Sequence, residues 1–396
     1  MNNRKIILKK GREYTIKNGH PWIFSGAVLK KDRGICSGEF VQVVSYNGEP
    51  LGCGWYSSRS QISVRMIYFG DKDVKEQDMI FNRIKRSLEF RDSIQDIIFS
   101  NAFRIINSEG DMLPGVIVDR YDDYLVCQFL CIGADKNRDL IVSILKEKIN
   151  CKGIFERSDS NVREKEGLKP IKSILFGQID NFVEIKERDV KFLVDIINGH
   201  KTGFYLDQRE NRYFLREIAK EKSILNCFSY TGGFGIHALK SGCKEIINVD
   251  KSYDALDILL KNIKLNGLSH DKSFIERQNV FTLLKRYSDK NRFFDIIILD
   301  PPKFVKGMGD LKNGIKGYKK LNIRALNIIK EGGYLFTFSC SGHVDMKTFK
   351  SIVAKSLKES NREGIIIKEL SQAIDHPYSP NFPQGRYLKG LVVRVY

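Results

Sequence analysis

Short apolar runs alternate with helical patterns over the C-terminal half of the chain, from about residue 188 onward. Alternation of this kind is typical of a largely parallel, doubly wound sheet in which helices connect the strands. We therefore predict an α/β fold for residues 188–396, built on a mostly parallel seven-stranded sheet. The apolar runs place its strands at residues 223–228, 245–250, 273–277, 294–300, 333–339, 365–370 and 388–395.

The first 70 residues have a different pattern, in which apolar and polar positions alternate over short stretches. Two such stretches flank Asn47-Gly48, a dipeptide that favours the tight turn of a β-hairpin. A further strand is expected at 61–69. The lysine-rich start of the chain reads as an edge strand with its lysines exposed. Residues 1–70 are therefore predicted to form a small β-rich domain, with a boundary near 70–73.

Residues 74–187 mix both patterns and are predicted to form a central α+β domain. Amphipathic periodicity indicates helices at about 74–92 and 135–149, with strand-like runs between them. The charged stretch at 161–167 reads as a solvated helix. We find no catalytic signature in this domain.

Composition indicates a class of partner only through charge, since the 396-residue chain carries a formal net charge of +18. An excess of this size suits a polyanion, and nucleic acid is the most common one. No apolar run is long enough to span a membrane, and the N-terminus lacks the apolar segment of a signal peptide. The eight cysteines form no C-x-x-C pair, and no histidine lies at metal-binding spacing from them. We therefore expect reduced thiols, no metal site and a cytoplasmic location.

A candidate cofactor site lies within residues 223–250, where an apolar strand runs into Gly232-Gly233-Phe234-Gly235 and then a helix. Glycines let the backbone approach a ligand closely, and amides at the helix start point toward it. Asp250 ends the second strand, where a carboxylate can hold the ribose hydroxyls of an adenosine. Residues 233–238 also satisfy G-x-G-x-x-A, so a nicotinamide dinucleotide, and with it an oxidoreductase, stays open at this point.

The fourth predicted strand ends in Asp300-Pro301-Pro302. The two prolines remove two amide donors and stiffen the turn. The Asp300 carboxylate then faces the carboxyl ends of the strands, where open α/β sheets bind ligands. Dehydrogenases do not need such an edge, whereas enzymes that methylate planar bases do, because a ring amino or imino group must be held edge-on.

The fifth strand ends in F-S-C-S-G, which places Cys340 among small polar residues after an apolar run. A packing cysteine would lie inside the run, so this position favours a nucleophile over a buried apolar residue. A thiolate that adds to C6 of cytosine makes C5 reactive toward an activated methyl group. Ser339 and Ser341 are candidates to hydrogen-bond the sulfur, and Asp300 is a candidate to protonate or hydrogen-bond N3.

These motifs together resemble the PUA-domain-containing, S-adenosylmethionine-dependent 23S ribosomal RNA cytosine-5 methyltransferases of bacteria. The resemblance covers essentially the whole chain. It implies an N-terminal RNA-binding PUA domain at 1–70, a central α+β domain at 74–187 and a Rossmann-like class I methyltransferase domain at 188–396. The motifs that carry it are G-H-P-W-I-F-S-G (19–26), E-G-D-M-L-P-G-V-I-V-D-R-Y (109–121), K-T-G-F-Y-L-D-Q-R (201–209), F-S-Y-T-G-G-F-G (228–235), L-D-P-P-K-F (299–304), S-C-S-G (339–342), D-H-P (375–377) and Y-L-K-G (387–390).

The resemblance also implies roles for single residues. The methionine and ribose side of S-adenosylmethionine would be lined by Phe228, Ser229, Tyr230, Gly232 and Asp250. The segment T-G-F-Y-L-D-Q-R would pack over the cofactor, with Gln208 and Arg209 at its methionine end. Asp300 would lie at the transfer site, and Cys340 would be the attacking thiol. Ribosomal RNA would contact Arg12, Trp22, Lys30 and Lys303, although Trp22 is also a candidate core residue.

Two departures keep alternatives open. Asn279 stands where an acid is expected to meet the adenine amino group, and its carbonyl is the remaining acceptor. Lys303 and Phe304 follow D-P-P where some RNA cytosine-5 methyltransferases carry a second cysteine. The rival interpretations are a base-nitrogen RNA methyltransferase and a noncatalytic RNA-binding assembly protein. The sequence leaves the target nucleotide and the oligomeric state open, with a homodimer as one option.

Overall fold

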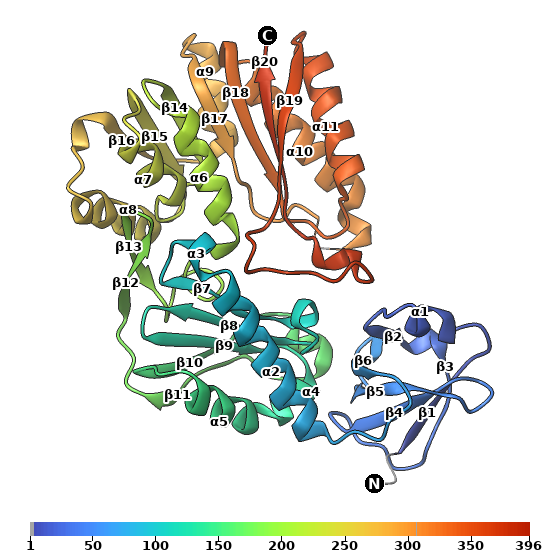
Figure 1. Ribbon diagram of the computed structural model, residues 1–396. Coiled ribbons are helices and arrows are strands. Elements are labelled where there is room, and N and C mark those ends of the chain that lie inside the picture. The colour runs from blue at the N-terminus through green and yellow to red at the C-terminus, as the bar shows by residue number, and fades with distance from the viewer. Residues whose placement is uncertain (1–3, 306) are drawn as a thin grey trace. The chain divides into compact units, whose positions relative to one another are not determined.

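The computed structural model describes residues 4–305 and 307–396, and contacts divide the chain into two compact units (Figure 1). The first unit contains the residues up to Ile185, together with Val194–Leu206 and Ile374–Gly385. The second contains Lys186–Leu193, Asp207–Ala373 and Arg386–Tyr396. Two segments from the predicted domain at 188–396 therefore belong to the first unit.

A six-stranded sheet forms the N-terminal part of the first unit, in the order β2-β6-β5-β4-β1-β3. The predicted hairpin is confirmed, since β4 pairs antiparallel with β5 across a turn in which Gly48 has a φ of 84°. This left-handed conformation is readily adopted only by glycine and a few other residues. The elements are β1 (Lys5–Leu8), α1 (Glu13–Lys17), β2 (Trp22–Phe24), β3 (Val28–Lys31), β4 (Phe40–Val44), β5 (Pro50–Tyr56) and β6 (Ile62–Phe69).

The prediction of an edge strand at the start of the chain is wrong. Strand β1 lies inside the sheet, where it pairs parallel with β4 and antiparallel with β3. The outer strand is β3, whose lysines are exposed, and the predicted exposure of the lysines at the chain start is confirmed for Lys5, Lys9 and Lys10.

A five-stranded sheet in the order β11-β10-β9-β8-β7 forms the rest of the first unit, with the helices packed around it. The predicted helix at 74–92 is confirmed as α2, and the one at 135–149 is divided between α4 and α5 at Asn137. The elements are α2 (Glu76–Ser93), α3 (Gln95–Ile98), β7 (Ala102–Asn107), β8 (Val116–Tyr121), β9 (Tyr124–Phe129), α4 (Ile132–Lys136), α5 (Arg138–Lys148), β10 (Gly153–Ser158) and β11 (Ile171–Gly177).

The charged stretch at 161–167 contains a short 3-10 turn in which Arg163 and Glu166 are buried and Glu164 and Lys165 are exposed, so the expected solvated helix is wrong. Arg163 is 1% exposed and its guanidinium lies 2.9 Å from Asp135. Glu166 is 2% exposed and lies 2.9 Å from the Arg65 guanidinium. Opposite charges from distant parts of the chain make this burial possible, because an unpaired buried charge is very costly.

The second unit contains a seven-stranded sheet in the order β16-β15-β14-β17-β18-β20-β19. All seven strands predicted from the apolar runs are confirmed, and all pairs are parallel except those of β20. Strands β12 (Phe182–Glu187) and β13 (Val190–Asp195) form a separate hairpin through which the division between the units passes. The elements of the second unit are α6 (Arg209–Ile218), β14 (Ser223–Cys227), α7 (Gly233–Lys240), β15 (Glu245–Asp250), α8 (Tyr253–Leu265), β16 (Ser273–Arg277), α9 (Val280–Asp289), β17 (Phe294–Leu299), α10 (Leu311–Leu326), β18 (Ile329–Ser339), α11 (Met346–Glu359), β19 (Gly364–Leu370) and β20 (Lys389–Val395).

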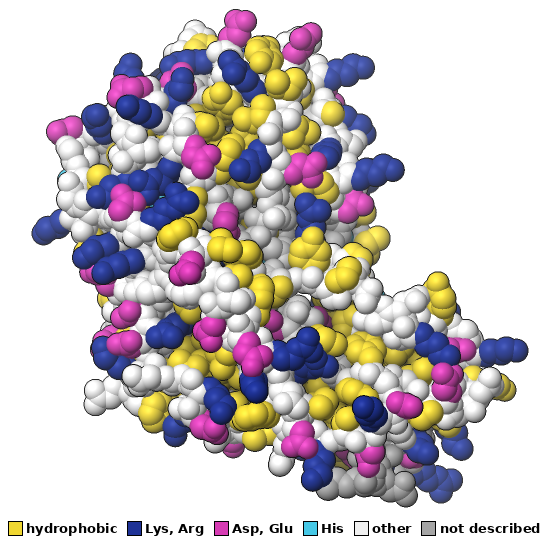
Figure 2. Space-filling view, viewed as in Figure 1, with side chains coloured by type: hydrophobic (Ala, Val, Ile, Leu, Met, Phe, Trp, Pro, Cys, Tyr) yellow, Lys and Arg dark blue, Asp and Glu magenta, His cyan; other side chains and the backbone are white. Residues whose placement is uncertain are grey.

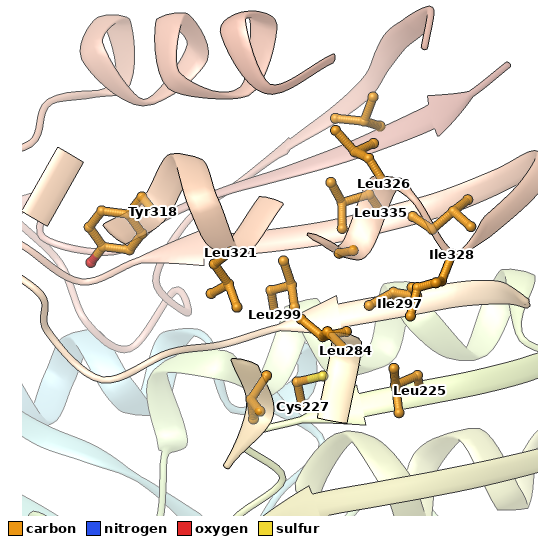
Figure 3. Close-up of a cluster of buried hydrophobic side chains, with 14 of the residues drawn as sticks. Leu225, Cys227, Leu284, Ile297, Leu299, Tyr318, Leu321, Leu326, Ile328 and Leu335 are labelled. Carbon is orange, nitrogen blue, oxygen red and sulfur yellow. The ribbon is translucent and has the colours of Figure 1, made fainter. Parts of the chain in front are cut away.

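One face of this sheet packs against α9, α10 and α11 (Figure 3). Alternate residues of the strands, such as Leu225 and Cys227 on β14 and Leu299 on β17, point into this core and are fully buried. Figure 3 also shows that the Tyr318 ring lies at one end of the cluster, with its hydroxyl turned away from the other side chains. The core therefore fixes the ends of β14 and β17, after which the candidate site residues follow.

The opposite face of the sheet packs against α6 and α7. The intervening residues of the strands point this way, including Phe336, whose ring lies 6.1 Å from Phe214 on α6. A Cβ at Gly235 on α7 would lie only 2.4 Å from the Asn248 side-chain oxygen on β15. Gly235 thus permits α7 to pack directly on the sheet, which sets the position of the glycine-rich loop before it.

Candidate functional site

The loop between β14 and α7 has an unusual backbone. Phe228 and Tyr230 have φ values of 61° and 49°, and Gly232 has a φ of 88°. Left-handed conformations at non-glycine residues cost roughly 1–3 kcal/mol each and persist only where the surroundings enforce them. Hydrogen bonds from the Ser229 amide to the Val249 carbonyl and from the Tyr230 amide to the Asp250 carboxylate supply that restraint, both at 2.9 Å. The loop is thus folded against the end of β15.

Two hydroxyls in this loop indicate that a polar ligand belongs there. Ser229 Oγ and Thr231 Oγ1 are buried and have no hydrogen-bond partner among the described residues. Buried hydroxyls are nearly always satisfied in folded proteins, so an unsatisfied pair at a strand end points to a missing partner. Thr231 was not predicted from the sequence, although its place in the motif S-Y-T-G-G was a usable signal.

Asp250 is placed to hold a ribose. Its two carboxylate oxygens accept from the amides of Tyr230 at 2.9 Å and Ser252 at 3.0 Å. Each oxygen has a second lone pair, which remains for a ligand hydroxyl. The unsatisfied hydroxyls, the half-buried carboxylate and the amides at the start of α7 together fit the adenosyl and methionine groups of S-adenosylmethionine.

The side chain of Asn279 has a structural role that the sequence did not reveal. Its carbonyl oxygen caps α9 by accepting from the amides of Phe281 at 2.9 Å and Thr282 at 3.4 Å. The oxygen expected to accept from the adenine amino group is therefore already engaged. A contact of Asn279 with adenine would use its NH2 group as a donor to a ring nitrogen, and this contact remains a prediction.

Gln208 connects the predicted cofactor segment with the D-P-P turn. Its side-chain nitrogen donates to Asp300 at 3.0 Å, and its oxygen accepts from Asn211 at 2.6 Å. Gln208 is 2% exposed, and Arg209 beside it is fully buried. The structure thus brings Gln208 to the carboxylate predicted to act at the transfer site.

The motif K-T-G-F-Y-L-D-Q-R is divided between the two units at Leu206 and Asp207. In the first unit the Thr202 hydroxyl donates to Asp119 at 2.6 Å, and the Phe204 amide donates to the Tyr121 hydroxyl at 3.1 Å. Only the residues from Asp207 onward belong to the unit that carries the glycine-rich loop. The packing of the whole motif over a cofactor thus remains a prediction.

Cys340 follows directly after β18 and is half-buried. Its neighbour Ser341 holds the turn in place, because its hydroxyl accepts from the Val305 amide at 3.2 Å and lies 2.9 Å from the Tyr318 hydroxyl. The Ser339 hydroxyl accepts from the Ser341 amide at 3.4 Å. These bonds tie the turn around the sulfur to the D-P-P turn.

A second thiol in the same unit shows what a packing cysteine looks like. Cys227 on β14 is fully buried in the core, and this burial raises the pKa of its thiol well above the ordinary value. Cys340 lies beyond its strand and retains access to solvent. The two positions match the distinction drawn from the sequence between a thiol inside an apolar run and one after it.

Lys389 lies beside Cys340 and was not predicted as a site residue. It is 3% exposed, and its Nζ donates to the carbonyls of Ser341 at 2.8 Å and Tyr387 at 2.6 Å. Burial lowers the pKa of Lys389 to about 8, although a negative charge on Cys340 raises it. The signal in the sequence was a lysine that interrupts the apolar run of a predicted strand, in L-K-G-L-V-V.

The residues predicted to contact RNA differ in their surroundings. Arg12, Lys30 and Lys303 are exposed. Trp22 is only partly exposed, because its indole nitrogen donates to Glu109 at 2.7 Å and its ring lies 4.6 Å from that of Phe382. The structure thus gives Trp22 the packing role that was its alternative interpretation. Exposed aromatic rings near this sheet belong to Phe24 on β2, Tyr14 on α1 and Tyr46 in the turn between β4 and β5.

On the face of the molecule drawn in Figure 2, the positive charge is not gathered in one place. Figure 2 shows lysine and arginine side chains over the whole visible face, with aspartate and glutamate side chains among them. Within the described part of the chain, no helix is long and apolar enough to cross a membrane.

Comparisons with known proteins agree with this site. Residues 6–69 match the family described as PUA-like domain, and residues 171–384 match the family described as S-adenosylmethionine-dependent methyltransferase. The chain is 43% identical over 392 residues to "Ribosomal RNA large subunit methyltransferase I" of Aeromonas hydrophila, covering 98% of this chain and 99% of that protein. A proposed SAM-dependent methyltransferase from Streptococcus mutans and a proposed methyltransferase complexed with SAH share its fold, each with a TM-score of 0.86 and 23% identity over 98% of this chain and 99% of theirs.

Proposed function

The chain belongs to the S-adenosylmethionine-dependent methyltransferases, in the family of the ribosomal RNA large subunit methyltransferases I, and from this premise we propose that it methylates C5 of a cytosine in 23S ribosomal RNA. The proposed route is a covalent adduct between Cys340 and C6 of the ring. The family membership supports a methyl transfer to large-subunit ribosomal RNA. The site residues support the choice of atom and of mechanism.

The chemistry requires a nucleophile, because C5 of cytosine is itself too unreactive to attack a methyl group. S-adenosylmethionine supplies an activated methyl group on its sulfonium. The Cys340 thiolate adds to C6, and the electron density gained at C5 allows this carbon to take the methyl group. Loss of the C5 proton and release of the thiolate restore the ring, so one difficult step becomes several easier ones.

The observation that carries the proposal is that Cys340 and Asp300 follow neighbouring parallel strands. Strands β17 and β18 pair with Leu299 opposite Thr337, so both residues lie at the carboxyl edge of the sheet. The glycine-rich loop follows β14, which is the other neighbour of β17. Ligands of open α/β sheets bind at this edge, so a nucleophile, a carboxylate and a cofactor loop share it.

Asp300 is proposed to orient the base. Gln208 holds one of its oxygens, which fixes the direction of the carboxylate. Pro301 and Pro302 offer no amide donors that would compete for that carboxylate. We propose that this carboxyl group hydrogen-bonds N3 of the ring as the adduct forms and N3 gains a proton.

A base-nitrogen RNA methyltransferase is the second candidate, and one observation favours it. Lys303 and Phe304 follow D-P-P, so the turn carries no second thiol to assist the later steps. In that case Asp300 would direct a ring or exocyclic nitrogen to the methyl group, and Cys340 would be dispensable. The half-buried, strand-end position of Cys340 argues for the covalent route.

RNA binding is proposed to involve the N-terminal domain. PUA-like folds and the exposed cations Arg12 and Lys30 suit contacts with phosphates. Lys303 directly follows the D-P-P turn, and we propose that it contacts the backbone of the target nucleotide. Affinity that rests on such contacts falls as salt rises, because bound cations are released from the RNA.

The test is methylation of unmodified 23S ribosomal RNA by the full chain and by Cys340→Ala. We expect the product to contain 5-methylcytosine, and the variant to be slower by roughly 1,000-fold or more, as is usual when a covalent nucleophile is removed. Calorimetry should show unchanged affinity for S-adenosylmethionine. Cys36→Ala, at an exposed thiol in the first unit, is the matched control and should retain full activity.

The remaining outcomes separate the alternatives. Undiminished methylation by Cys340→Ala, with the methyl group on nitrogen, would establish the base-nitrogen methyltransferase. Absence of S-adenosylmethionine binding at millimolar concentration would favour a noncatalytic RNA-binding protein, and preferential binding of a nicotinamide dinucleotide would revive the oxidoreductase.

A further inference from the structure

Lys389 is a buried cation on the strand next to the proposed nucleophile. It is the first residue of β20, which pairs antiparallel with β18, and it lies opposite Ser339 in this pairing. Its Nζ donates to the carbonyls of Ser341 and Tyr387, which restrain the ammonium at the turn that contains Cys340. The side chain is thus held in one direction by two hydrogen bonds and by the register of two strands.

The charge of Lys389 is not balanced by an ion pair. Among the described residues, no carboxylate oxygen lies within 4.0 Å of its Nζ, and its hydrogen bonds go to neutral carbonyls. A buried ammonium in such a place is costly, so proteins rarely keep one without a use for it. A thiolate at Cys340 would supply the missing negative charge.

The other charged groups around the pair come from four further elements. Asp345, which caps α11, raises the pKa of Lys389, whereas Lys303 after β17 and Arg386 before β20 lower it. Tyr318 on α10 faces the same turn, and burial raises the pKa of its hydroxyl, so this group stays neutral. Lys303 is exposed and Arg386 partly exposed, and solvent therefore weakens their effect on the sulfur.

We propose that Lys389 is a positioning residue that holds the sulfur of Cys340 as a thiolate, through the ammonium fixed at the Ser341 carbonyl. The inference rests on the proposed function, because the thiolate is the form that attacks C6. The thiol proton leaves to solvent, and the ammonium keeps its three protons. The sulfur loses its charge when the S–C6 bond forms. The charge returns when that bond breaks, with the electron pair, so Lys389 favours both the attacking and the leaving form.

The proposal predicts a signature that a structural lysine would not give. Replacing Lys389 with methionine removes an unbalanced buried charge and keeps an unbranched chain of similar length. Folding stability is then expected to stay level or rise, because apolar replacement of buried charges is often neutral or stabilising. The reactivity of Cys340 is expected to fall at the same time, since the thiolate is the reactive form.

The experiment measures alkylation of the full chain by iodoacetamide between pH 5.5 and 10, without RNA or cofactor. Mass spectrometry of the peptide that contains Cys340 gives the rate, with the exposed Cys36 in the same sample as internal reference. In the wild-type chain, the midpoint of the plot of Cys340 alkylation rate against pH is expected clearly below the ordinary cysteine pKa of about 8.5. Lys389→Met should move the midpoint up by at least about one pH unit, which slows alkylation at pH 7 roughly tenfold.

Two further variants make the result specific. Lys389→Arg keeps a cation, so the midpoint pH for Cys340 alkylation should stay close to the low wild-type value. This conservative variant would thus preserve the reactivity that Lys389→Met loses. Lys330→Met is the matched control, because Lys330 lies at the opposite end of β18 in an ion pair with Asp295. It should leave the Cys340 profile unchanged. Lys389→Gln, which can still donate one hydrogen bond, serves if the methionine variant does not fold.

A wild-type midpoint at or above about 8.5 would overturn the proposal without any variant. So would a Lys389→Met or Lys389→Gln profile that superimposes on the wild-type profile. Neither result depends on methyl transfer, so the two hypotheses fail separately. If the midpoint for Cys340 is low but no 5-methylcytosine forms, the proposed function is wrong and the Cys340–Lys389 pair stands. If 5-methylcytosine forms but the midpoint has the ordinary value, the pair is wrong and the proposed function stands.

Discussion

Two buried cations of the second unit, Arg212 and Lys389, lie in opposite electrostatic settings. Arg212 on α6 binds Glu187 through its Nε at 2.9 Å and through a second, shorter contact, and His237 on α7 lies 3.0 Å from the same carboxylate. All three side chains are almost fully buried. Lys389 binds only carbonyls, beside a thiol that can lose its proton.

The difference separates the charge of Arg212, which stabilises the fold, from the charge of Lys389, which is proposed to act on the thiol. In the Arg212 cluster, the guanidinium and the Glu187 carboxylate balance each other's charge. In the proposed pair, the Cys340 thiolate is the group that balances the charge of Lys389. A buried cation whose counter-charge is a reactive group is therefore a sign of function, whereas a closed ion pair is a sign of structure.

The largest expected effect tests this separation through stability. Arg212→Met should lower the free energy of unfolding by about 3–5 kcal/mol, because it leaves the Glu187 carboxylate buried without its cation. Lys389→Met should change it by less than about 1 kcal/mol or raise it. Urea denaturation followed by circular dichroism at pH 7.5 measures both.

The control for this pair is Arg216→Met on the same helix, whose guanidinium pairs with the exposed Asp189. Exposed pairs contribute about 0–1 kcal/mol, so the loss should be small. Equal losses for Arg212→Met and Lys389→Met would mean that both cations are structural.

Substitution of Asp250 should affect both stability and ligand binding, because this carboxylate holds the loop and is proposed to hold the ribose. Asp250→Asn keeps one acceptor oxygen for a backbone amide but loses the second. We expect affinity for S-adenosylmethionine to fall about tenfold, equivalent to ~1.4 kcal/mol, with a smaller loss of stability. Calorimetry and thermal unfolding measure the two effects. An affinity that stays at the wild-type level would remove Asp250 from the cofactor site.

Tyr318 offers a smaller and more local test of the turn around Cys340. Tyr318→Phe deletes the hydroxyl that contacts Ser341 and leaves the packed ring in place. The lost hydrogen bond should cost about 1 kcal/mol, and methylation should slow by roughly fivefold as the turn loosens. Single-turnover kinetics measure the rate. A rate equal to wild type would show that the Tyr318 hydroxyl is not needed to position the turn.

The pH dependence of folding stability should reflect the buried cluster of Arg212, Glu187 and His237. For Glu187, burial alone would raise the pKa, but the charge of Arg212 and the hydrogen bond from His237 outweigh it and hold the pKa at about 2. Burial also lowers the pKa of His237, against the pull of Glu187. Both groups thus bind protons more weakly when folded, and both contribute stability that is present at high pH and lost as pH falls.

The loss should begin below the unfolded histidine value of about 6.5 and continue as Glu187 titrates below about 4.5. Melting temperatures between pH 8 and 5 should therefore decline, and His237→Gln should flatten this part of the curve. A parallel decline in the variant would assign the acid sensitivity to other groups.

The sequence predicted the strands of the second unit well, because parallel strands buried on both faces appear as continuous apolar runs. The run at 294–300 became β17 at Phe294–Leu299. Strand β18 begins four residues earlier than expected, since Ile329 pairs with Phe294 across an irregular step in register. The same runs place Cys340 and Asp300 directly after strands and Asp250 at the last position of one, whereas the chemical roles of these residues remain predictions.

The errors and omissions share a physical cause, which is that distant segments decide them. Strand β1 was misplaced because its outer partner, V-L-K-K, has too few apolar residues to be recognised as a strand. Glu166 was taken as exposed because its partner Arg65 lies 101 residues away. Lys389 was not predicted as a site residue because its proposed role depends on Ser341. The pairing of β18 with β20 brings these two residues together.

The position of β20 in the seven-stranded sheet sets the order in which the enzyme matures during synthesis. It follows β19 along the chain but is inserted between β18 and β19. A nascent chain that has reached residue 380 already contains the thiol, the D-P-P turn and the glycine-rich loop, yet β18 still has an open edge and Cys340 has no ammonium beside it. In the proposed pairing of Cys340 with Lys389, the thiol therefore acquires its cation only after β20 has been synthesised and has paired with β18.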